Sequence, residues 1–332
     1  MAVPEVGGIE GADSWSPIAE ARSIRGALRG LLSFFRKKPL GAICGLIVFF
    51  FMLVGDLVPE AINQFAGISG LADEPVPYFA DFLADNTGFL RHYQDADLRN
   101  RLDGSSSDHL LGTDPLGRDI LSRLLYGART AVVIAFGATF MSAVLQILVN
   151  VPAGYYLGWY DKIMYRIVDV VDSLPTLVVL LVLFGVFGSG FWQIILAIGF
   201  LQGFSGRYLR GQTISVSQNP YIEAARVIGA SDTRIMMRYI LPNVMPLIIL
   251  SATLRLGLVV LLEASLSFLG YGVPPPFPSW GQMLSLDGRE FMRQAPGLAI
   301  YPGLAIGLLV FSFNLFGDAL RDVLDPRLRG SR

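Results

Sequence analysis

The chain has 332 residues, of which 53 % are apolar and only 16 % are charged, and its formal net charge is −1. A soluble domain carries about 25 % charged residues, so a chain with a mean hydropathy of +0.53 lacks the polar surface that a water-soluble protein of this size needs. The weak net charge argues against nucleic acid as a partner, and one cysteine with two histidines excludes an intrachain disulfide and disfavours a Cys/His metal site.

The polar segment 1–38 is expected to be a cytoplasmic tail. Its last part, from Arg22 to Lys38, alternates basic and apolar residues at helical spacing. This pattern predicts an amphipathic helix on an anionic membrane face, or an ordinary helix flanking the first span. No cleavable signal peptide is evident before the apolar block that begins near Pro39.

Apolar blocks of bilayer length predict an all-α, polytopic membrane protein with six transmembrane helices. These spans are expected at about residues 40–58, 128–157, 167–187, 191–204, 244–262 and 298–316. Lys and Arg are concentrated in the short segments that would face the cytoplasm together with both termini. The predicted domains are the tail 1–38, a first span 39–58, an outer loop 59–127, a transmembrane core 128–318 with a second outer loop 271–297, and a cytoplasmic tail 319–332.

The inner loop 205–243 is too polar to span a bilayer but is dense with helix signals. Asn219 is a good N-cap and Pro220 a good first helical residue. Glu223 lies in the first turn, where the helix dipole favours an anion. Gly229 then ends the helix, because glycine enters the left-handed region without penalty.

A second helix follows in the same loop. Ser231 or Asp232 is its expected cap, and we expect it to end before Pro242. A rigid helix pair on the inner face suits the docking of a soluble partner, since the small Ala224 and Ala225 would let a partner approach the backbone. An ordinary interfacial helical hairpin is the alternative.

The run Glu223-Ala224-Ala225, the later Gly229 and the pair Leu241-Pro242 resemble the EAA loop of ABC importer permeases. In that family the loop forms a cytoplasmic coupling helix that sits in a groove of the ATPase subunit. Tyr239 departs from the pattern, which usually has Ile there. The resemblance implies that the ATPase-coupling residues are Glu223, Ala224, Ala225, Gly229, Ala230, Ser231 and Asp232.

Further motifs, at about residues 111–129, 155–175, 263–270, 278–281 and 313–327, resemble the dipeptide/oligopeptide/nickel branch and its second permease type. Together they cover about residues 30–330. The fourth predicted span departs from the branch, which usually has Trp where this chain has Gly203 or Phe204.

The resemblance implies half of a translocation path for peptides or a related small solute, in a prokaryotic inner membrane. The implied partners are a second homologous permease, two ATPase subunits, an extracytoplasmic substrate-binding protein and the lipid bilayer. ATP and Mg would bind the ATPase subunits, and this chain would hold no cofactor of its own.

The sequence contains no Walker A motif, because none of its three lysines follows a Gly-x4-Gly pattern. It also offers no nucleophile with a matching base, so we expect a transport subunit and not an enzyme. The alternatives are a membrane scaffold and a secondary transporter driven by an ion gradient. A secondary transporter is expected to have carboxylates or broken helices near the membrane midplane.

Two charged residues fall in or near the fifth span. A charge at membrane depth is costly and usually faces protein or water. Arg255 and Glu263 are therefore candidates for a polar lining of the translocation path. The alternative is an interhelical ion pair, for example with Asp169 or Asp172.

A cluster of charges precedes the second span: Asp114, Arg118, Asp119 and Arg123. Mutual pairing would fix the outer loop in place. Alternatively, this surface would receive the substrate-binding protein. His109 nearby is expected to be a surface residue.

Overall fold

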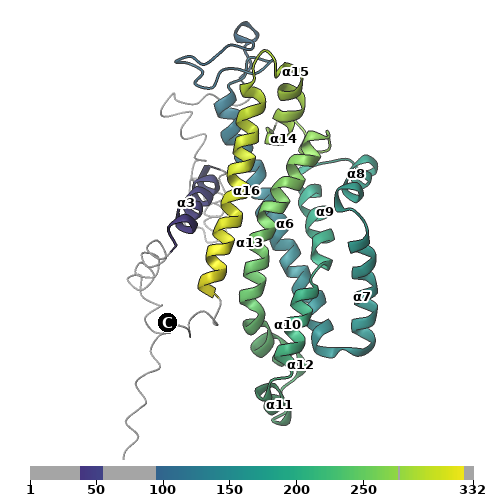
Figure 1. The fold of residues 1–332 in the computed structure, drawn as a ribbon. Helices are drawn as coiled ribbons and strands as arrows, with labels where there is room; N and C mark the ends of the chain where they lie inside the picture. Colours follow the sequence, from purple (N-terminus) through teal and green to yellow (C-terminus); the bar gives the residue numbers. More distant parts are fainter. Residues whose placement is uncertain (1–37, 55–94, 276, 325–332) are drawn as a thin grey trace, which may run out of the picture.

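The computed structural model describes residues 38–54, 95–275 and 277–324, and every regular element in these ranges is helical. The predicted amphipathic helix therefore lies outside the described residues except for Lys38, as do most of the first outer loop and the end of the C-terminal tail. Figure 1 shows a bundle of long helices with short helices gathered at both ends.

The long helices of the bundle are α3 (Pro39–Val54), α6 (Ile120–Tyr156), α7 (Gly158–Ser173), α8 (Thr176–Phe187), α9 (Phe191–Phe204), α13 (Leu241–Phe268) and α16 (Gly297–Leu324). One end of the bundle, called the inner end after the predicted inner loop, holds α10 (Arg207–Ser217), α11 (Pro220–Val227), α12 (Asp232–Ile235) and the π-helical turn η2 (Met236–Ile240). The opposite end, called the outer end after the predicted outer loops, holds η1 (Leu98–Asn100), α14 (Trp280–Gln282), η3 (Met283–Gly288) and α15 (Arg289–Phe291).

Three continuous helices, 120–156, 232–268 and 297–322, have the length and hydropathy to cross a membrane. The pair α7 and α8 forms a fourth candidate span, bent by 84°, and α3 and α9 are shorter apolar helices. The predicted fourth span coincides with α9, whereas the prediction of an unbroken third span at 167–187 is wrong. Pro175 explains the break, because a proline disfavours helical geometry in the preceding residue and Leu174 is extended at φ −93°, ψ 134°.

The prediction that the second loop helix ends before Pro242 is also wrong. The helix continues from Asp232 through α12, η2 and α13 to Phe268. Directly before Pro242 the ladder widens: the Leu241 amide bonds to the Met236 carbonyl, five residues back. Such a π-bulge gives the proline ring room that a regular α-helical turn lacks, so the helix passes the proline without ending.

Close packing of α9 on α6 accounts for the departure at Gly203. A Cβ at Gly203 would lie 2.6 Å from Cβ of Leu145, and one at Gly199 would lie 2.8 Å from Met141. The helices approach each other so closely that a side chain at either position would have to displace α6. A tryptophan at position 203 is therefore incompatible with this packing.

The outer end is covered by what we call the outer cap, residues 95–119 together with 278–288. Trp280 is 1 % exposed, and its indole Nε1 donates to the Leu124 carbonyl of α6 at 2.8 Å. Gly127 makes room for the ring, since a Cβ there would lie 2.8 Å from the indole. Thr130 of α6 donates to the Pro278 carbonyl at 2.9 Å. The second outer loop is thus fixed on α6. Trp280 of the motif at 278–281 and Gly127 of the motif at 111–129 contact each other directly.

Candidate coupling and translocation sites

The predicted inner loop forms a compact structure at the inner end of the bundle, and we call residues 219–235 the inner hairpin. Asn219 lies at the N-cap of α11, but its side chain makes no capping hydrogen bond and instead donates to the Val216 carbonyl at 3.0 Å. Pro220 is the first helical residue and Glu223 lies in the first turn, as the sequence predicts. The dipole and the proline, and not a side-chain cap, start this helix.

Gly229 makes the turn between α11 and α12. It adopts φ +81°, its amide bonds to the Arg226 carbonyl at 2.9 Å, and the Ala230 amide bonds to the Ala225 carbonyl at 3.0 Å. These two bonds are those of a Schellman motif, which requires a left-handed residue at this position. The side chain of Ser231 then caps α12 by accepting from the Arg234 amide at 3.4 Å.

Asp232 connects the hairpin to α6. Its Oδ1 accepts a hydrogen bond of 2.7 Å from the Tyr155 hydroxyl, and the guanidinium of Arg226 lies 5.1 Å from the centre of the Tyr155 ring. Both sides of the glycine turn are therefore held to one aromatic residue near the end of α6. A displacement of the hairpin would be transmitted directly to that long helix.

The underside of the hairpin packs on the bundle. Ile222 and Ile235 are fully buried, and Ala225 is 3 % exposed within the same apolar cluster. The expectation that both alanines face a partner is therefore wrong for Ala225, which packs against its own chain. Ala224 and Glu223 are exposed.

Two exposed apolar residues at the tip were not singled out by the sequence analysis. Val227 is 86 % exposed and Ile228 is 80 % exposed, directly before the Gly229 turn. Large apolar side chains on a water-facing loop indicate an interaction surface. Their place next to the glycine stop was the one local signal, and it does not distinguish them from the buried apolar residues of the same loop, such as Ile222.

Arg255 does not form the predicted ion pair. Its guanidinium donates to the carbonyl oxygens of Gln202 and Ser205, each at 3.2 Å. The predicted acidic partners, Asp169 and Asp172, lie instead beside Arg207, at 2.9 and 3.5 Å. The C-terminal end of α9, where the helix dipole is negative, takes the place of a carboxylate for Arg255.

Glu263 lies near the outer end of α13 and is 1 % exposed. Its Oε1 accepts a hydrogen bond of 2.7 Å from the Ser267 hydroxyl, one helical turn further on. Within the described residues it forms no ion pair. The carboxyl group is therefore covered by atoms of the same chain, and Ser267 and Ser279 are its polar neighbours.

The four outer charges are brought together, but mostly in the interior. The fully buried Asp114 carboxylate accepts from Arg118 Nε at 2.7 Å, from Arg123 and from the backbone amides of Leu116 and Arg118. Arg123, whose side chain is 5 % exposed, also contacts Asp287 of η3 at 2.8 Å. Burial raises the pKa of the Asp287 carboxyl, and the Arg123 charge opposes that rise. This pairing joins the two outer loops.

Asp119 serves a different purpose from the other three charges. It caps α6 by accepting from the Ser122 amide at 2.8 Å, and its other oxygen lies 3.1 Å from Nδ1 of His109. His109 is 5 % exposed, so the expectation that it lies on the surface is wrong. His109 is buried because it is a hydrogen-bond partner of the buried Asp119 carboxylate, whose other oxygen caps α6.

Comparison with known proteins adds a family to this geometry. Residues 146–330, more than half of the chain, match the family described as "Binding-protein-dependent transport system inner membrane component". The chain is 43 % identical over 236 residues to the "Glutathione transport system permease protein GsiD" of Escherichia coli O6:K15:H31 (strain 536 / UPEC), covering 70 % of this chain and 77 % of that protein.

A protein of the same name from Pectobacterium atrosepticum is 39 % identical over 266 residues, covering 80 % of this chain and 86 % of its own length. A solved structure described as "Inward facing conformations of the MetNI methionine ABC transporter" matches with a TM-score of 0.48 at 18 % identity, covering 61 % of this chain and 96 % of that one. With a family match over more than half of its length and relatives near 40 % identity, this multi-pass chain belongs to the family of binding-protein-dependent inner membrane transport components and is the non-catalytic permease subunit of an ABC importer.

Proposed function

We propose that the cargo of this permease is a peptide-like solute. The observation that carries the proposal is the 43 % identity, over most of both chains, to a protein named as a glutathione transport permease. Because the chain belongs to a family of ABC importer permeases, we no longer favour an ion-gradient transporter or a scaffold. A panel of di- and tripeptides that includes glutathione tests the cargo, offered to cells with and without the gene. Loss of peptide uptake in the deletion is expected, and unchanged uptake of every member would overturn the proposal.

We further propose that the importer contains a second homologous permease, two ATPase subunits that bind ATP and Mg, and an extracytoplasmic substrate-binding protein. This chain would contribute half of the path and bind no cofactor. Purification of the tagged chain from membranes tests this composition. A second permease and ATPase chains in stable ratio are expected, and a chain that purifies alone would contradict it.

The inner hairpin is our candidate for the ATPase-coupling element. Support comes from its shape: a rigid turn at Gly229, an underside packed on the bundle, and an exposed tip with Glu223, Ala224, Val227 and Ile228. Ala230, Ser231 and Asp232 act by holding that tip through the turn, the α12 cap and the bond to Tyr155. Closure of the ATPases would push the hairpin, and the attached α6 and α13 would carry the motion into the membrane. Glu223→Ala and Gly229→Asp test this, with reduced coupling of ATP hydrolysis to uptake expected, because the first removes an exposed charge of the tip and the second adds a charge beside its apolar residues.

We propose six crossings with both termini in the cytoplasm: α3, α6, the bent pair α7–α8, α9, α13 and α16. The ion pair between Lys38 and Asp322, at 2.5 Å, supports a common side for the start of α3 and the end of α16. That end of the bundle is also the end of the inner hairpin (Figure 1). Labelling of single cysteines from either side of the membrane tests the orientation, and outward labelling near Asp322 would contradict it.

For the path itself we propose that Arg255 contributes polar lining at the inner half, since carbonyl oxygens hold it and no carboxylate neutralises it among the described residues. Arg255→Gln is expected to lower uptake at normal abundance, and normal uptake would overturn the role.

On the outer face, we propose that the cluster of Asp114, Arg118, Asp119 and Arg123 presents mainly Arg118 to the binding protein. The side chain of Arg118 is the most exposed of those in the ion pairs of this cluster, at 22 %. Arg118→Glu is expected to weaken binding-protein stimulation of the ATPases, and unchanged stimulation would contradict it.

A further inference from the structure

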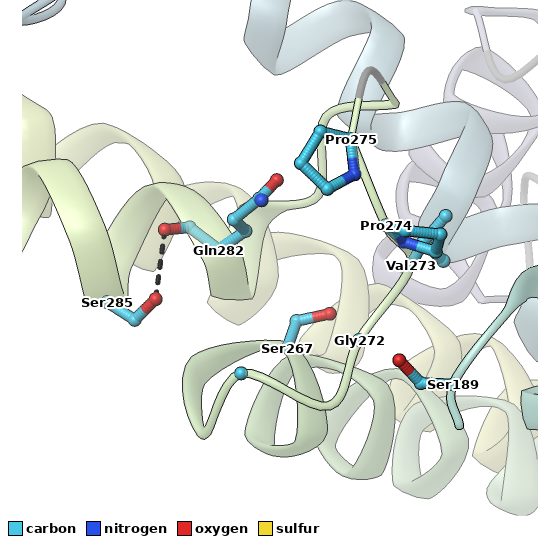
Figure 2. Close-up of a pocket in the computed structure, with 9 residues that line it drawn as sticks. Ser189, Ser267, Gly272, Val273, Pro274, Pro275, Gln282 and Ser285 are labelled. Atoms are coloured by element: carbon cyan, nitrogen blue, oxygen red, sulfur yellow. Dashed lines mark hydrogen bonds between the residues drawn. The ribbon is translucent and has the colours of Figure 1, made fainter. Parts of the chain in front are cut away.

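A cavity of about 330 Å³ lies at the outer end of the chain, between the end of α13, the turn that joins α8 to α9, and η3. Its polar lining comes from Ser189, Ser267, Gln282 and Ser285, and the stiff segment at Pro274 and Pro275 forms another side (Figure 2). Small-molecule sites have volumes of roughly 300–1,000 Å³. This cavity lies at the small end of that range, so it would hold one end of a small solute rather than an extended chain.

Two close approaches between the second outer loop and α13 lie beside the cavity. A Cβ at Gly272 would lie 1.9 Å from Oγ of Ser267, and a Cβ at Gly281 would lie 2.2 Å from the Ala264 carbonyl. Backbone from the second outer loop therefore rests directly on α13 at two places. The cavity lies next to these close backbone contacts, which fix the second outer loop against α13.

The hydroxyl groups in the wall are oriented by bonds to the protein. Ser267 donates to the Glu263 carboxylate at 2.7 Å, and Ser285 donates to the Gln282 carbonyl at 3.2 Å, the contact drawn as a dashed line in Figure 2. Each of these hydroxyl groups donates its single proton within the chain, so its oxygen lone pairs remain free to accept hydrogen bonds from a ligand. The side-chain amide of Gln282 makes no hydrogen bond to any described residue and adds a further acceptor and donor.

The lining of the cavity contains no charged side chain. The buried carboxyl group of Glu263 lies behind Ser267, one hydrogen bond from the wall. Because the oriented hydroxyl oxygens accept and no Lys or Arg is present, such a site favours a group that donates hydrogen bonds, and it offers nothing to neutralise a carboxylate. A peptide has an ammonium group at its amino end and amide N–H groups behind it.

We propose that this cavity is a substrate-contact site on the outer side of the permease and that it takes the amino-terminal end of a peptide-like solute. The inference rests on the proposed peptide-like cargo. Gln282, Ser285 and Ser267 would accept from the ammonium and the first amide, and Glu263 would act as a positioning residue through Ser267. Specificity for a free amino end would then reside partly in this chain and not wholly in the binding protein.

Transport with one fixed binding protein isolates the contribution of the permease. The probe is the peptide that the wild-type importer takes up fastest from the panel above, in proteoliposomes, paired with its N-acetylated form. Gln282→Leu and Ser285→Ala are expected to lower uptake of the free peptide about tenfold, as expected for a lost hydrogen bond to a charged group. Glu263→Gln is expected to lower the preference for the free over the acetylated peptide. Gln294→Leu, an exposed outer glutamine that does not line the cavity, is the matched control.

A structural defect would instead reduce assembled importer and the ATP hydrolysis that the loaded binding protein stimulates, and both are expected to stay normal in Gln282→Leu. Wild-type uptake of peptides combined with equal uptake by Gln282→Leu and Gln294→Leu would overturn the cavity as a contact site and leave the proposed cargo standing. Failure of the wild type to take up any peptide would overturn the cargo, and this inference with it.

Occupancy is measured separately with Ser285→Cys, because the single native cysteine, Cys44, is buried. The rate of labelling by a membrane-impermeant maleimide is followed in the full importer with dialanine, N-acetyl-dialanine or putrescine. Protection by dialanine beyond that by its acetylated form is expected. Equal protection by the two peptides, or protection by putrescine alone, would overturn the assignment to a peptide amino end.

Discussion

The loops at the two ends of the helix bundle are held on it by different kinds of contact. The outer cap is joined by buried charges and a buried indole: Asp114 and Asp287 share Arg123, and Trp280 is bonded to α6. The inner hairpin is joined by backbone bonds around Gly229 and by an apolar underside. The cap pairs its buried charges within the chain, whereas the hairpin leaves Val227 and Ile228 exposed.

This difference indicates that the charged cluster of the outer cap is fixed by contacts within the chain, whereas the tip of the inner hairpin is left uncovered by them. A buried ion-pair network is costly to disturb, so it favours one fixed arrangement. A hairpin held by a turn and a packed underside is expected to move as a unit, and in the proposed coupling role an ATPase subunit would cover its exposed apolar tip. Variants at the two ends should therefore separate into those that lower stability and those that lower coupling.

Arg123→Leu is expected to have the largest effect on stability. It removes the cation shared by Asp114 and Asp287 and leaves the fully buried Asp114 with less compensation. Breaking a buried pair by removal of one partner costs about 3–5 kcal/mol. Thermal unfolding of the purified chain in detergent measures the loss. Arg118→Leu, at the more exposed partner of Asp114, is the control and should cost clearly less; equal losses would contradict a buried network centred on Arg123.

Gly229→Val is expected to have the next largest effect. The residue adopts φ +81°, and no atom lies within 4 Å of a Cβ there, so the cost is conformational and not steric crowding. A left-handed non-glycine residue costs about 1–2 kcal/mol, and more for a β-branched one. Gly229→Asn is the matched variant, because asparagine tolerates this region. Uptake per ATP hydrolysed should fall in Gly229→Val and be largely kept in Gly229→Asn; equal behaviour of the two would contradict the conformational explanation.

A smaller, pH-dependent effect is expected at Asp287. Because burial raises the pKa of its carboxyl in the folded chain, the folded state binds more protons than the unfolded state between the two pKa values. The contribution of this group to stability therefore falls as the pH rises through that window, which lies above the ordinary Asp pKa of about 3.9. The stability difference between wild type and Asp287→Asn should shift in favour of wild type on acidification. A difference that does not change with pH would contradict the assignment.

Local signals predicted much of this fold. Apolar blocks predicted α3, α6, α9, α13 and α16, and Pro220, Gly229 and Ser231 predicted the inner hairpin, because each of these three residues acts through its own local geometry. The break at Pro175 and the continuation through Pro242 were both predicted wrongly, and for a common reason. A proline ends a helix unless the neighbouring turn widens to make room for its ring, as η2 does before Pro242.

Contacts between distant segments were beyond the sequence. The pairing of Arg123 with Asp287, 164 positions away, and the replacement of the expected carboxylate by carbonyl groups at Arg255 depend on how helices approach one another. The burial of Ala225 and His109 depends on the same packing. An exposed pair such as Val227 and Ile228 is visible only once the opposite face of its helix is known to be buried.

The variant pair Val227→Ser and Ile228→Ser is expected to have the smallest effect on stability and thereby gives the sharpest test of the comparison. Both side chains are at least 80 % exposed, so their replacement removes little buried surface within the chain, and surface substitutions usually change stability by less than about 0.5 kcal/mol. If the tip docks on an ATPase, the same change should weaken that association, measured as ATPase retained on the immobilised permease. Ile222→Ser, on the fully buried side of the same helix, is the matched control and should instead destabilise the chain. Full ATPase retention by the double tip variant would contradict a docking role for this end, because the two most exposed apolar side chains of the hairpin would then have no partner.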